Sequence, residues 1–199
     1  MQQSNLRTLR IVRMVLWALV VVVAIGASAL YFLRPPERPL GLNGQSFAMT
    51  SLDGEQFTEA DLRGTPSLLF FGFTHCPDVC PTTLGDTAYW RDRLDLSQDD
   101  LRVIFVTVDP QRDTQEQLEG YLAGWDGSVI GLRGTEEQTE DIKSAFGVFS
   151  ERVGDGDEYT VNHTASVFMI DDDGSFEGTI AYQEDTETAL AKIERLVEG

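Results

Sequence analysis

The sequence predicts an α/β layered domain that follows an N-terminal transmembrane helix. Two observations predict the domain: short apolar runs typical of buried strands alternate with helical patterns, and a hairpin and a closing helix come after them. A third predicts the membrane segment, because residues 14–33 carry no charge and 18 of these 20 residues are apolar. A helix of this length spans about 30 Å, the hydrocarbon thickness of a bilayer.

Three arginines, Arg7, Arg10 and Arg13, precede the apolar run and place residues 1–13 in the cytoplasm. A cleaved signal peptide is the alternative, since Ala27-Ser28-Ala29 resembles a cleavage site. The apolar run continues past that point, which favours a retained anchor. The short tail, without a long transit peptide, indicates a bacterium, so we expect a single-pass protein of the bacterial inner membrane with its soluble domain in the periplasm.

Residues 34–41 form a stiff, proline-rich linker, and residues 42–199 form the domain. Of 15 basic residues, four lie in residues 1–34, so 11 basic residues face 33 acidic ones in residues 35–199, a net charge of −22. The negative electrostatic field of so many acidic residues argues against nucleic acid or an anionic membrane surface as a partner of the domain. It permits a cationic partner or a metal, although solubility alone also explains it.

The first half of the domain alternates strands and helices. A hairpin is expected over residues 47–57 around the turn at 52–54, and a buried central strand over 67–73. A helix over 81–96 begins with Pro81 in its first turn, and a second buried strand covers 103–108.

The second half continues this alternation and ends in hairpins. Helices are expected over residues 114–122 and 136–146, and a hairpin over 148–161 around the turn at 154–157. A second hairpin pairs 167–170 with 178–182, and a helix over 186–197 closes the domain. The pattern therefore contains two strand–helix units, followed by hairpins and a helix.

Cys76 and Cys80 are the only cysteines, and they lie between a buried strand and a helix. This is where such a sheet presents ligands, and a helix N-terminus lowers the pKa of a nearby thiol. A spacing of four lets both sulfurs face one point, either bonded together or sharing one metal. A plain stabilising disulfide is the alternative, but it would close a very small loop and gain little entropy.

His163 is one of only two histidines and precedes the strand that starts near Ser166. In a sheet of this order, the loop before that strand returns beside the loop after the first central strand, so His163 can face both cysteines. Two thiolates and an imidazole form a soft ligand set that suits copper, with zinc as the main competitor. His75 adjoins Cys76 and is the weaker candidate, because adjacent side chains usually point to different places.

The segment from Phe71 to Leu84, FGFTHCPDVCPTTL, resembles the signature of the Sco/SenC family, and VTVDPQRDT at residues 106–114 and His163-Thr164 support the resemblance. It covers about residues 42–197 and the anchor. It implies a thioredoxin-like fold, a central mixed sheet flanked by helices. Members of this family are membrane-anchored copper proteins of cytochrome c oxidase assembly. The resemblance therefore implies one bound copper ion, Cu(I) or Cu(II), with Cys76, Cys80 and His163 as its ligands. The implied partners are the copper-centre subunit of the oxidase and a copper donor protein.

Asp78 and Asp109 are candidates for a supporting role. Asp78 lies between the cysteines, and Asp109 ends the second buried strand at the same sheet edge. Either side chain can hydrogen-bond to the site or dock a partner. For Asp109 the alternative is turn chemistry, since Asp-Pro commonly opens a turn.

Two functions are compatible with these residues, and a third fits them poorly. A copper-binding assembly factor, acting as a metallochaperone or as a thiol reductant, uses all three candidate ligands. A thiol–disulfide oxidoreductase of exported proteins needs only Cys76 and Cys80. A thiol peroxidase on a related fold would need a different setting of Thr and Arg around its cysteine. We expect a binding protein and not an enzyme; if the chain is an enzyme, we expect a thiol–disulfide oxidoreductase. His163 discriminates between the two, because thiol exchange needs only the cysteines whereas copper retention needs the imidazole as well.

Overall fold

The computed structural model describes residues 13–14, 16–20, 22–23, 45–125, 127–156 and 158–199. The chain divides into two units, residues 1–37 and 38–199. The described residues among 13–23 are helical and exposed. Within the described part of the chain, no helix is both long enough and apolar enough to cross a bilayer. Most of the predicted anchor at 14–33, and the whole of the linker at 34–41, lie outside the described residues.

The larger unit is built on a mixed, seven-stranded sheet with the order β2-β1-β5-β4-β3-β8-β9. Its centre is parallel: β3 (Ser67–Gly72) pairs with β4 (Arg102–Thr107), and β4 pairs with β5 (Val129–Arg133). Antiparallel strands complete both sides, namely β1 (Ala48–Ser51) and β2 (Gln56–Thr58) on one side, and β8 (Val167–Ile170) and β9 (Phe176–Ile180) on the other.

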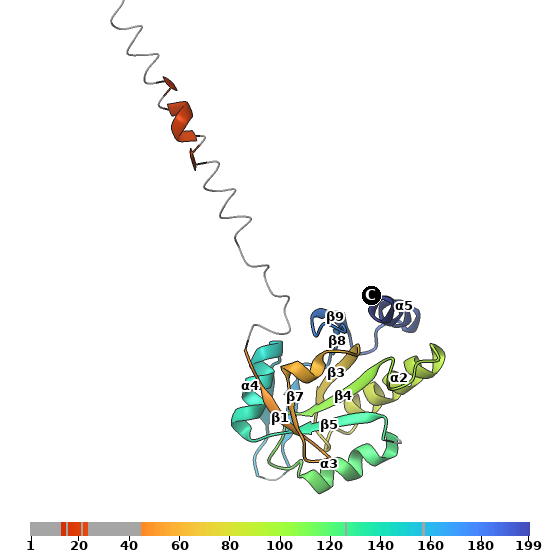
Figure 1. The fold of residues 1–199 in the computed structure, drawn as a ribbon. Helices are drawn as coiled ribbons and strands as arrows, with labels where there is room; N and C mark the ends of the chain where they lie inside the picture. Colours follow the sequence, from red (N-terminus) through yellow and green to blue (C-terminus); the bar gives the residue numbers. More distant parts are fainter. Residues whose placement is uncertain (1–12, 15, 21, 24–44, 126, 157) are drawn as a thin grey trace, which may run out of the picture. The chain divides into compact units, whose positions relative to one another are not determined.

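Helices cover both faces of this sheet (Figure 1). Helix α4 (Glu136–Phe146) packs into one hydrophobic cluster, and α2 (Val79–Arg93), α3 (Gln115–Leu122) and α5 (Thr186–Glu198) pack into the other. Strand β3 serves both clusters, because Leu69 and Phe71 point to the first while Leu68 and Phe70 point to the second. A strand buried on both faces reads as a continuous apolar run, as SLLFFG does.

Helix α4 shows how the local sequence sets an element's ends. Thr135 and Gln138 form a capping box at its start, and Gly147 ends it with φ of +65°, a conformation that glycine adopts without strain. Two 3-10 helices, η1 (Glu59–Leu62) and η2 (Ala123–Trp125), complete the helical segments that the structure describes.

A separate two-stranded ribbon consists of β6 (Ser150–Val153) and β7 (Thr160–His163). It corresponds to the hairpin predicted over 148–161, and its register places Ser150 opposite His163. His163 is therefore the last residue of a strand and not part of a loop. The ribbon follows α4 and leads directly into β8.

The α/β class and the mixed sheet flanked by helices are confirmed, and strand β5 is the main omission of the sequence analysis. Its segment, VIGLR, is short, contains Gly131 and ends in a charged residue, so it lacks the continuous apolar character of β3 and β4. The side chain of a residue at 131 would have to share space with Leu122 and Leu52, which explains the glycine. Helix α2 also begins earlier than expected, at Val79, with Pro81 still in its first turn.

Gly72, at the end of β3, leaves room for the chain that follows it. A Cβ at this position would lie 2.8 Å from the Cys80 sulfur and 2.8 Å from a ring carbon of Phe105. Neither neighbour has free space, since Cys80 and Phe105 are both fully buried. The glycine thus allows α2 and its cysteine to pack directly against the sheet.

We expect Gly72→Ala to lower the free energy of unfolding by about 1–3 kcal/mol, the usual cost of overpacking a core. Urea unfolding followed by circular dichroism measures this. Gly120→Ala is the matched control, because a Cβ at this position of helix α3 meets open space. Alanine is favoured over glycine inside a helix, so this variant should stabilise the fold by about 0.5–1 kcal/mol. Equal unfolding midpoints for Gly72→Ala and the wild type would contradict the close packing.

Candidate metal centre

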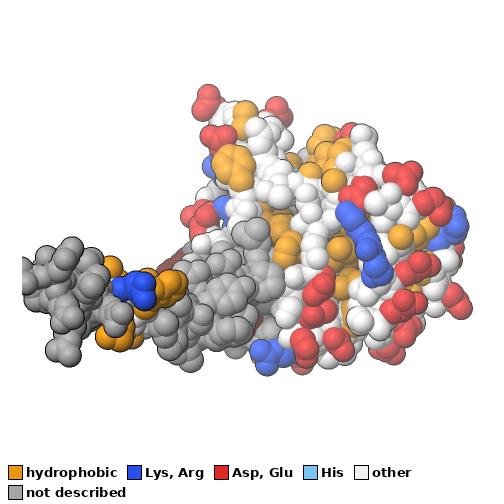
Figure 2. Space-filling model, turned by 90° about the horizontal axis from the view of Figure 1, so that it is seen from above, with side chains coloured by type: hydrophobic (Ala, Val, Ile, Leu, Met, Phe, Trp, Pro, Cys, Tyr) orange, Lys and Arg blue, Asp and Glu red, His pale blue; other side chains and the backbone are white. Residues whose placement is uncertain are grey.

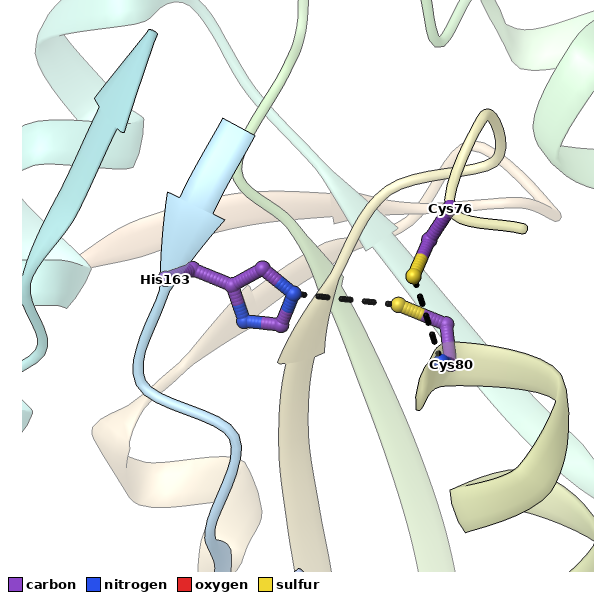
Figure 3. A group of neighbouring side chains, drawn as sticks. All are labelled: Cys76, Cys80 and His163. Atoms are coloured by element: carbon purple, nitrogen blue, oxygen red, sulfur yellow. Dashed lines mark hydrogen bonds between the residues drawn. The ribbon is translucent and has the colours of Figure 1, made fainter. Parts of the chain in front are cut away.

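Three segments bring Cys76, Cys80 and His163 together. Cys76 lies in the loop after β3, Cys80 is the second residue of α2, and His163 ends β7. One ligand atom from each residue lies within 4.8 Å of the others. Figure 3 shows both sulfurs and the imidazole pointing toward one common space. Among the described residues, this is the group of cysteine, histidine and carboxylate side chains whose geometry can hold a metal ion.

The pairing of β8 with β3 produces this meeting. The two strands are antiparallel, with Phe70 opposite Val167 and Ser67 opposite Ile170. Strand β8 therefore starts where β3 ends, and the residues just before β8 lie beside those just after β3. The juxtaposition of the His163 and cysteine segments, expected from the sequence, is confirmed.

The imidazole of His163 is oriented by its neighbours. Its Nδ1 lies 2.9 Å from the carbonyl oxygen of Thr164, which can only accept, so Nδ1–H donates there. Its Nε2 then faces the sulfurs, at 3.8 Å from Cys80 Sγ (Figure 3). The rings of Phe70 and Phe73 pack edge-on against the imidazole, with centroids 6.1 and 5.8 Å away. Such a hydrogen bond on the far nitrogen is typical of metal-binding histidines.

The two thiols differ in environment. Cys80 is fully buried, whereas Cys76 is half-buried, and both are free thiols. The Cys80 thiol donates a hydrogen bond to the Cys76 sulfur, and the amides of Cys80 and Asp78 add to this, which lowers the pKa of Cys76 to about 4. The Cys80 amide nitrogen lies 3.3 Å from that sulfur. The same thiol contact, and then burial, raise the pKa of Cys80.

An open hollow of about 250 Å³ adjoins the site. It is bordered by both ligand-bearing segments, with Cys76, Pro77 and Val79 on one side and Val161 and His163 on the other. The half-buried Cys76 is therefore reached from solvent through this hollow, while Cys80 is enclosed behind it.

His75 lies apart from the three grouped side chains. Its Nδ1 is 3.0 Å from the hydroxyl of Thr74 and 3.8 Å from a carboxylate oxygen of Asp113. The ring is about half exposed and belongs to no metal-binding group among the described residues. The expectation that neighbouring side chains diverge here agrees with this geometry.

The two aspartates singled out from the sequence have different surroundings. The exposed Asp78 side chain accepts a hydrogen bond from the Thr82 hydroxyl at 3.4 Å, and it is the Asp78 amide that supports the Cys76 sulfur. Asp109 is buried, and its carboxylate accepts from Arg112 and from the Tyr159 hydroxyl, each at 2.6 Å.

Asp113 is the residue that the sequence analysis missed. It is fully buried and accepts hydrogen bonds from the amide and hydroxyl of Thr74 and from the hydroxyl of Thr107. Burial raises the pKa of this carboxyl group, and the hydrogen bonds from Thr107 and Thr74 oppose that rise. A sequence signal was available, because Asp113 lies in the segment 106–114 that supported the resemblance.

The lowered pKa of Cys76 predicts an unusual reactivity profile. The rate of iodoacetamide alkylation at Cys76 should stay nearly constant from pH 8 to pH 6, because the thiolate persists down to about pH 4. An ordinary thiol with a pKa near 8.5 slows by about tenfold per pH unit over much of this range. Peptide mass spectrometry separates Cys76 from Cys80, which should react slowly throughout.

Two variants test the cause of this profile. Cys80→Ala removes the group that lowers the pKa of Cys76 most and should move the fall in rate to higher pH, while His75→Ala, the control, should not. A wild-type Cys76 rate that rises tenfold per unit from pH 6 to pH 8 would contradict the asymmetry of the pair.

Comparisons with known proteins place this geometry in a family. The family model described as SCO1/SenC matches residues 36–198. A SCO2-like protein of Rickettsia conorii is 37% identical over 174 residues, covering 79% of this chain and 85% of the relative. The mitochondrial SCO1 homolog of Homo sapiens is 38% identical over 139 residues, covering 68% of this chain and 46% of the relative. This chain therefore spans about half the length of that mitochondrial relative.

Solved structures agree with the fold and with the resemblance seen in the sequence. ScoI of Bradyrhizobium japonicum with copper bound is 34% identical, with a TM-score of 0.69 over 76% of this chain and 97% of that one. Yeast Sco1 with copper bound is 30% identical, with a TM-score of 0.70 over 77% of this chain and 87% of that one. The thioredoxin-like fold expected from the resemblance is supported by these likenesses. The chain belongs to the SCO1/SenC family.

Proposed function

We propose that this protein binds one copper ion through Cys76, Cys80 and His163 and serves the assembly of the copper centre of cytochrome c oxidase. The observation that carries the proposal is the convergence of two sulfurs and one imidazole nitrogen within 4.8 Å. Two thiolates are soft ligands that suit Cu(I), and the nitrogen adds the kind of donor that Cu(II) prefers. Copper-bound relatives with this fold, from Bradyrhizobium japonicum and yeast, support the choice of metal.

The protein's own residues prepare the site before a metal arrives. The Cys76 sulfur is held as an acceptor by the Cys80 thiol and two backbone amides, and His163 presents Nε2 because Nδ1 is engaged with Thr164. Copper supplies a cation to be handed on and a one-electron couple. The hollow beside Cys76 gives a partner access to the outer ligand, while Cys80 stays enclosed.

The partners we propose are a copper donor protein and the copper-centre subunit of the oxidase. Transfer between proteins requires the two sites to approach closely, so the rim of the hollow is the surface that meets them. Asp78 is exposed on that rim and is our candidate for partner docking. Asp109 is buried and acts on the site through the residues it binds.

A thiol–disulfide oxidoreductase of exported proteins is the second candidate function. The specific observation in its favour is the unequal pair of thiols, with an accessible thiolate and a buried thiol four residues away. Such a pair is suited to attack on a disulfide followed by resolution within the pair. The same chemistry would keep the cysteines of an oxidase copper centre reduced, so this function and copper delivery can share one site.

We further propose that residues 14–33 anchor the protein in the bacterial inner membrane, with the domain in the periplasm. The described side chains Met14, Leu16, Trp17, Leu19, Val20, Val22 and Val23 are all exposed, between 56% and 68%. A helix that exposes only apolar side chains over this stretch is suited to lipid. The excess of acid on the domain, seen on the face in Figure 2, keeps the domain itself off an anionic surface.

The copper site should be gated by redox state. The reduced protein should bind one copper per chain, and oxidation to the Cys76–Cys80 disulfide should abolish binding, because a disulfide offers no thiolate. His163→Ala should weaken Cu(II) binding by a few kcal/mol, where about 1.4 kcal/mol is tenfold, and Cu(I) binding by less. Copper stoichiometry and the thiolate-to-Cu(II) absorption band measure these effects.

His75→Ala is the matched control for the copper measurement, since His75 faces Thr74 and Asp113 instead of the sulfurs. It should keep a wild-type band. A normal band in His163→Ala together with a lost band in His75→Ala would overturn the ligand assignment. Equal binding by the disulfide form would overturn redox gating and favour the oxidoreductase function.

The anchor is tested by the intact mass of the protein recovered from a bacterial membrane fraction. Retention of residues 14–33 predicts a mass that includes the whole N-terminal segment, in a protein that alkaline carbonate does not extract. A mature protein beginning near Leu30 would show that the segment is a cleaved signal peptide.

A further inference from the structure

We propose that the turn Asp109–Asp113 positions the two halves of the site separately: Asp113 holds the cysteine loop, and Asp109 with Arg112 holds the ribbon that ends in His163. The copper readouts of this proposal rest on the proposed function, and its metal-free readouts do not. The turn follows β4 after one residue, Val108, and precedes Thr114, the residue that caps α3. It is thus fixed at both ends to the frame of the domain.

Asp113 ties the cysteine loop to the end of β4. One carboxylate oxygen accepts from the Thr74 hydroxyl at 2.7 Å, and the other accepts from the Thr74 amide at 3.1 Å and the Thr107 hydroxyl at 2.5 Å. A carboxylate accepts only, and three donors converge on it in a place without solvent. Thr74 is two residues before Cys76, whose own amide donates to the Phe73 carbonyl at 3.2 Å. The start of the loop is thereby fixed.

Asp109 and Arg112 clamp the other half through Tyr159, the residue just before β7. The Tyr159 hydroxyl donates to Asp109, and Arg112 donates to the Tyr159 carbonyl at 2.8 Å and to Asp109. The guanidinium carbons of Arg112 and Arg152 lie 3.5 and 3.6 Å from the Tyr159 ring centroid. Two groups so close cannot share one face, so they enclose the ring. The Arg152 side chain also donates to Gln111, within the same turn.

The ribbon needs such a clamp because it is a two-stranded sheet of its own. An isolated two-stranded hairpin is only marginally stable in water. Strand β6 is mostly exposed, and β7 buries Val161 alone among its four residues. The place of His163 relative to the sulfurs is therefore set by the contacts on either side of β7, namely Tyr159 before it and the Phe149–Thr164 hydrogen bonds after it.

If the cysteine loop and the His163 ribbon are positioned separately, a substitution in one half should disturb that half alone. Removing the Thr74 hydroxyl or the Asp113 carboxylate should loosen the sulfurs without moving His163. Releasing Tyr159 from Asp109 should loosen His163 without changing the sulfurs. If the turn had a purely structural role, each variant would instead weaken disulfide formation and Cu(II) binding together, in proportion to its loss of overall stability.

The cysteine half is tested on the metal-free full-length protein in detergent. At equilibrium with glutathione, the Cys76–Cys80 dithiol and oxidised glutathione give the internal disulfide and two reduced glutathione molecules. Thr74→Val and Asp113→Ala should shift this equilibrium toward the dithiol by about tenfold, because sulfurs held less closely bond less readily. Thr74→Ser keeps the hydroxyl and should retain the wild-type value.

The histidine half is tested by Tyr159→Phe and Tyr159→Ala. Both should leave the glutathione equilibrium unchanged. Both should weaken Cu(II) binding, Tyr159→Ala by about 10–100-fold, the usual effect of losing a group that orients a ligand. In the metal-free protein, the His163 ring proton signals should broaden in the same order. Ser67→Ala, which removes a buried hydroxyl at the opposite end of β3, is the control and should move neither readout.

Two results would overturn the proposal. One is a Tyr159 variant that shifts the glutathione equilibrium as much as Thr74→Val does, since the halves would then be coupled. The other is a wild-type equilibrium in Thr74→Val together with sharp His163 signals in Tyr159→Ala, since the turn would then position neither half. A wild type that binds no copper would refute the proposed function alone, because the glutathione and ring-signal measurements still decide the role of the turn.

Discussion

The antiparallel pairing of β8 with the central strand β3 is the constraint on which the site depends. The cysteine loop leaves the carboxyl end of β3, and the segment that contains His163 enters β8 at the same edge. Were β8 parallel to β3, its start would lie at the opposite end of the sheet, about 20 Å away for a six-residue strand. Cys80 and His163 are 83 positions apart in the sequence, and the direction of one strand brings their side chains to 3.8 Å from each other.

Close packing behind the sulfurs makes the two cysteines unequal. Gly72 lets α2 approach the sheet so closely that Cys80 is enclosed, while Cys76 stays in the loop beside the hollow. The contact with the Cys76 sulfur, and then burial, raise the pKa of the Cys80 thiol, and the same contact is the main cause of the lowered pKa of Cys76. The glycine at the end of β3 therefore contributes to the difference in exposure between the two sulfurs, because it allows the packing that buries Cys80.

The sequence predicted those features that depend on short-range pattern. The apolar run of β3, the helix α4 and the turns around Gly54 and Gly174 were predicted because their own residues carry the signal. Strand β5 was missed because its apolar character is interrupted, and its identity comes from a place beside β4 that only the sheet supplies. The meeting of the cysteines with His163 was foreseen from strand order. The role of Asp113 was not, because a buried carboxylate is recognised by its donors, and Thr74, which supplies two of them, lies 39 residues away in sequence.

Charge and ligand chemistry act at different ranges in this protein. Residues 35–199 carry 33 acidic residues against 11 basic ones, and the resulting negative electrostatic field attracts cations of every kind. The site itself offers two sulfurs and one nitrogen, and no carboxylate belongs to the group. Hard cations such as Ca²⁺ and Mg²⁺, which prefer oxygen ligands, gain little from such donors. The field therefore gathers cations without discrimination, and the softness of the three donors selects among those that reach the hollow beside Cys76.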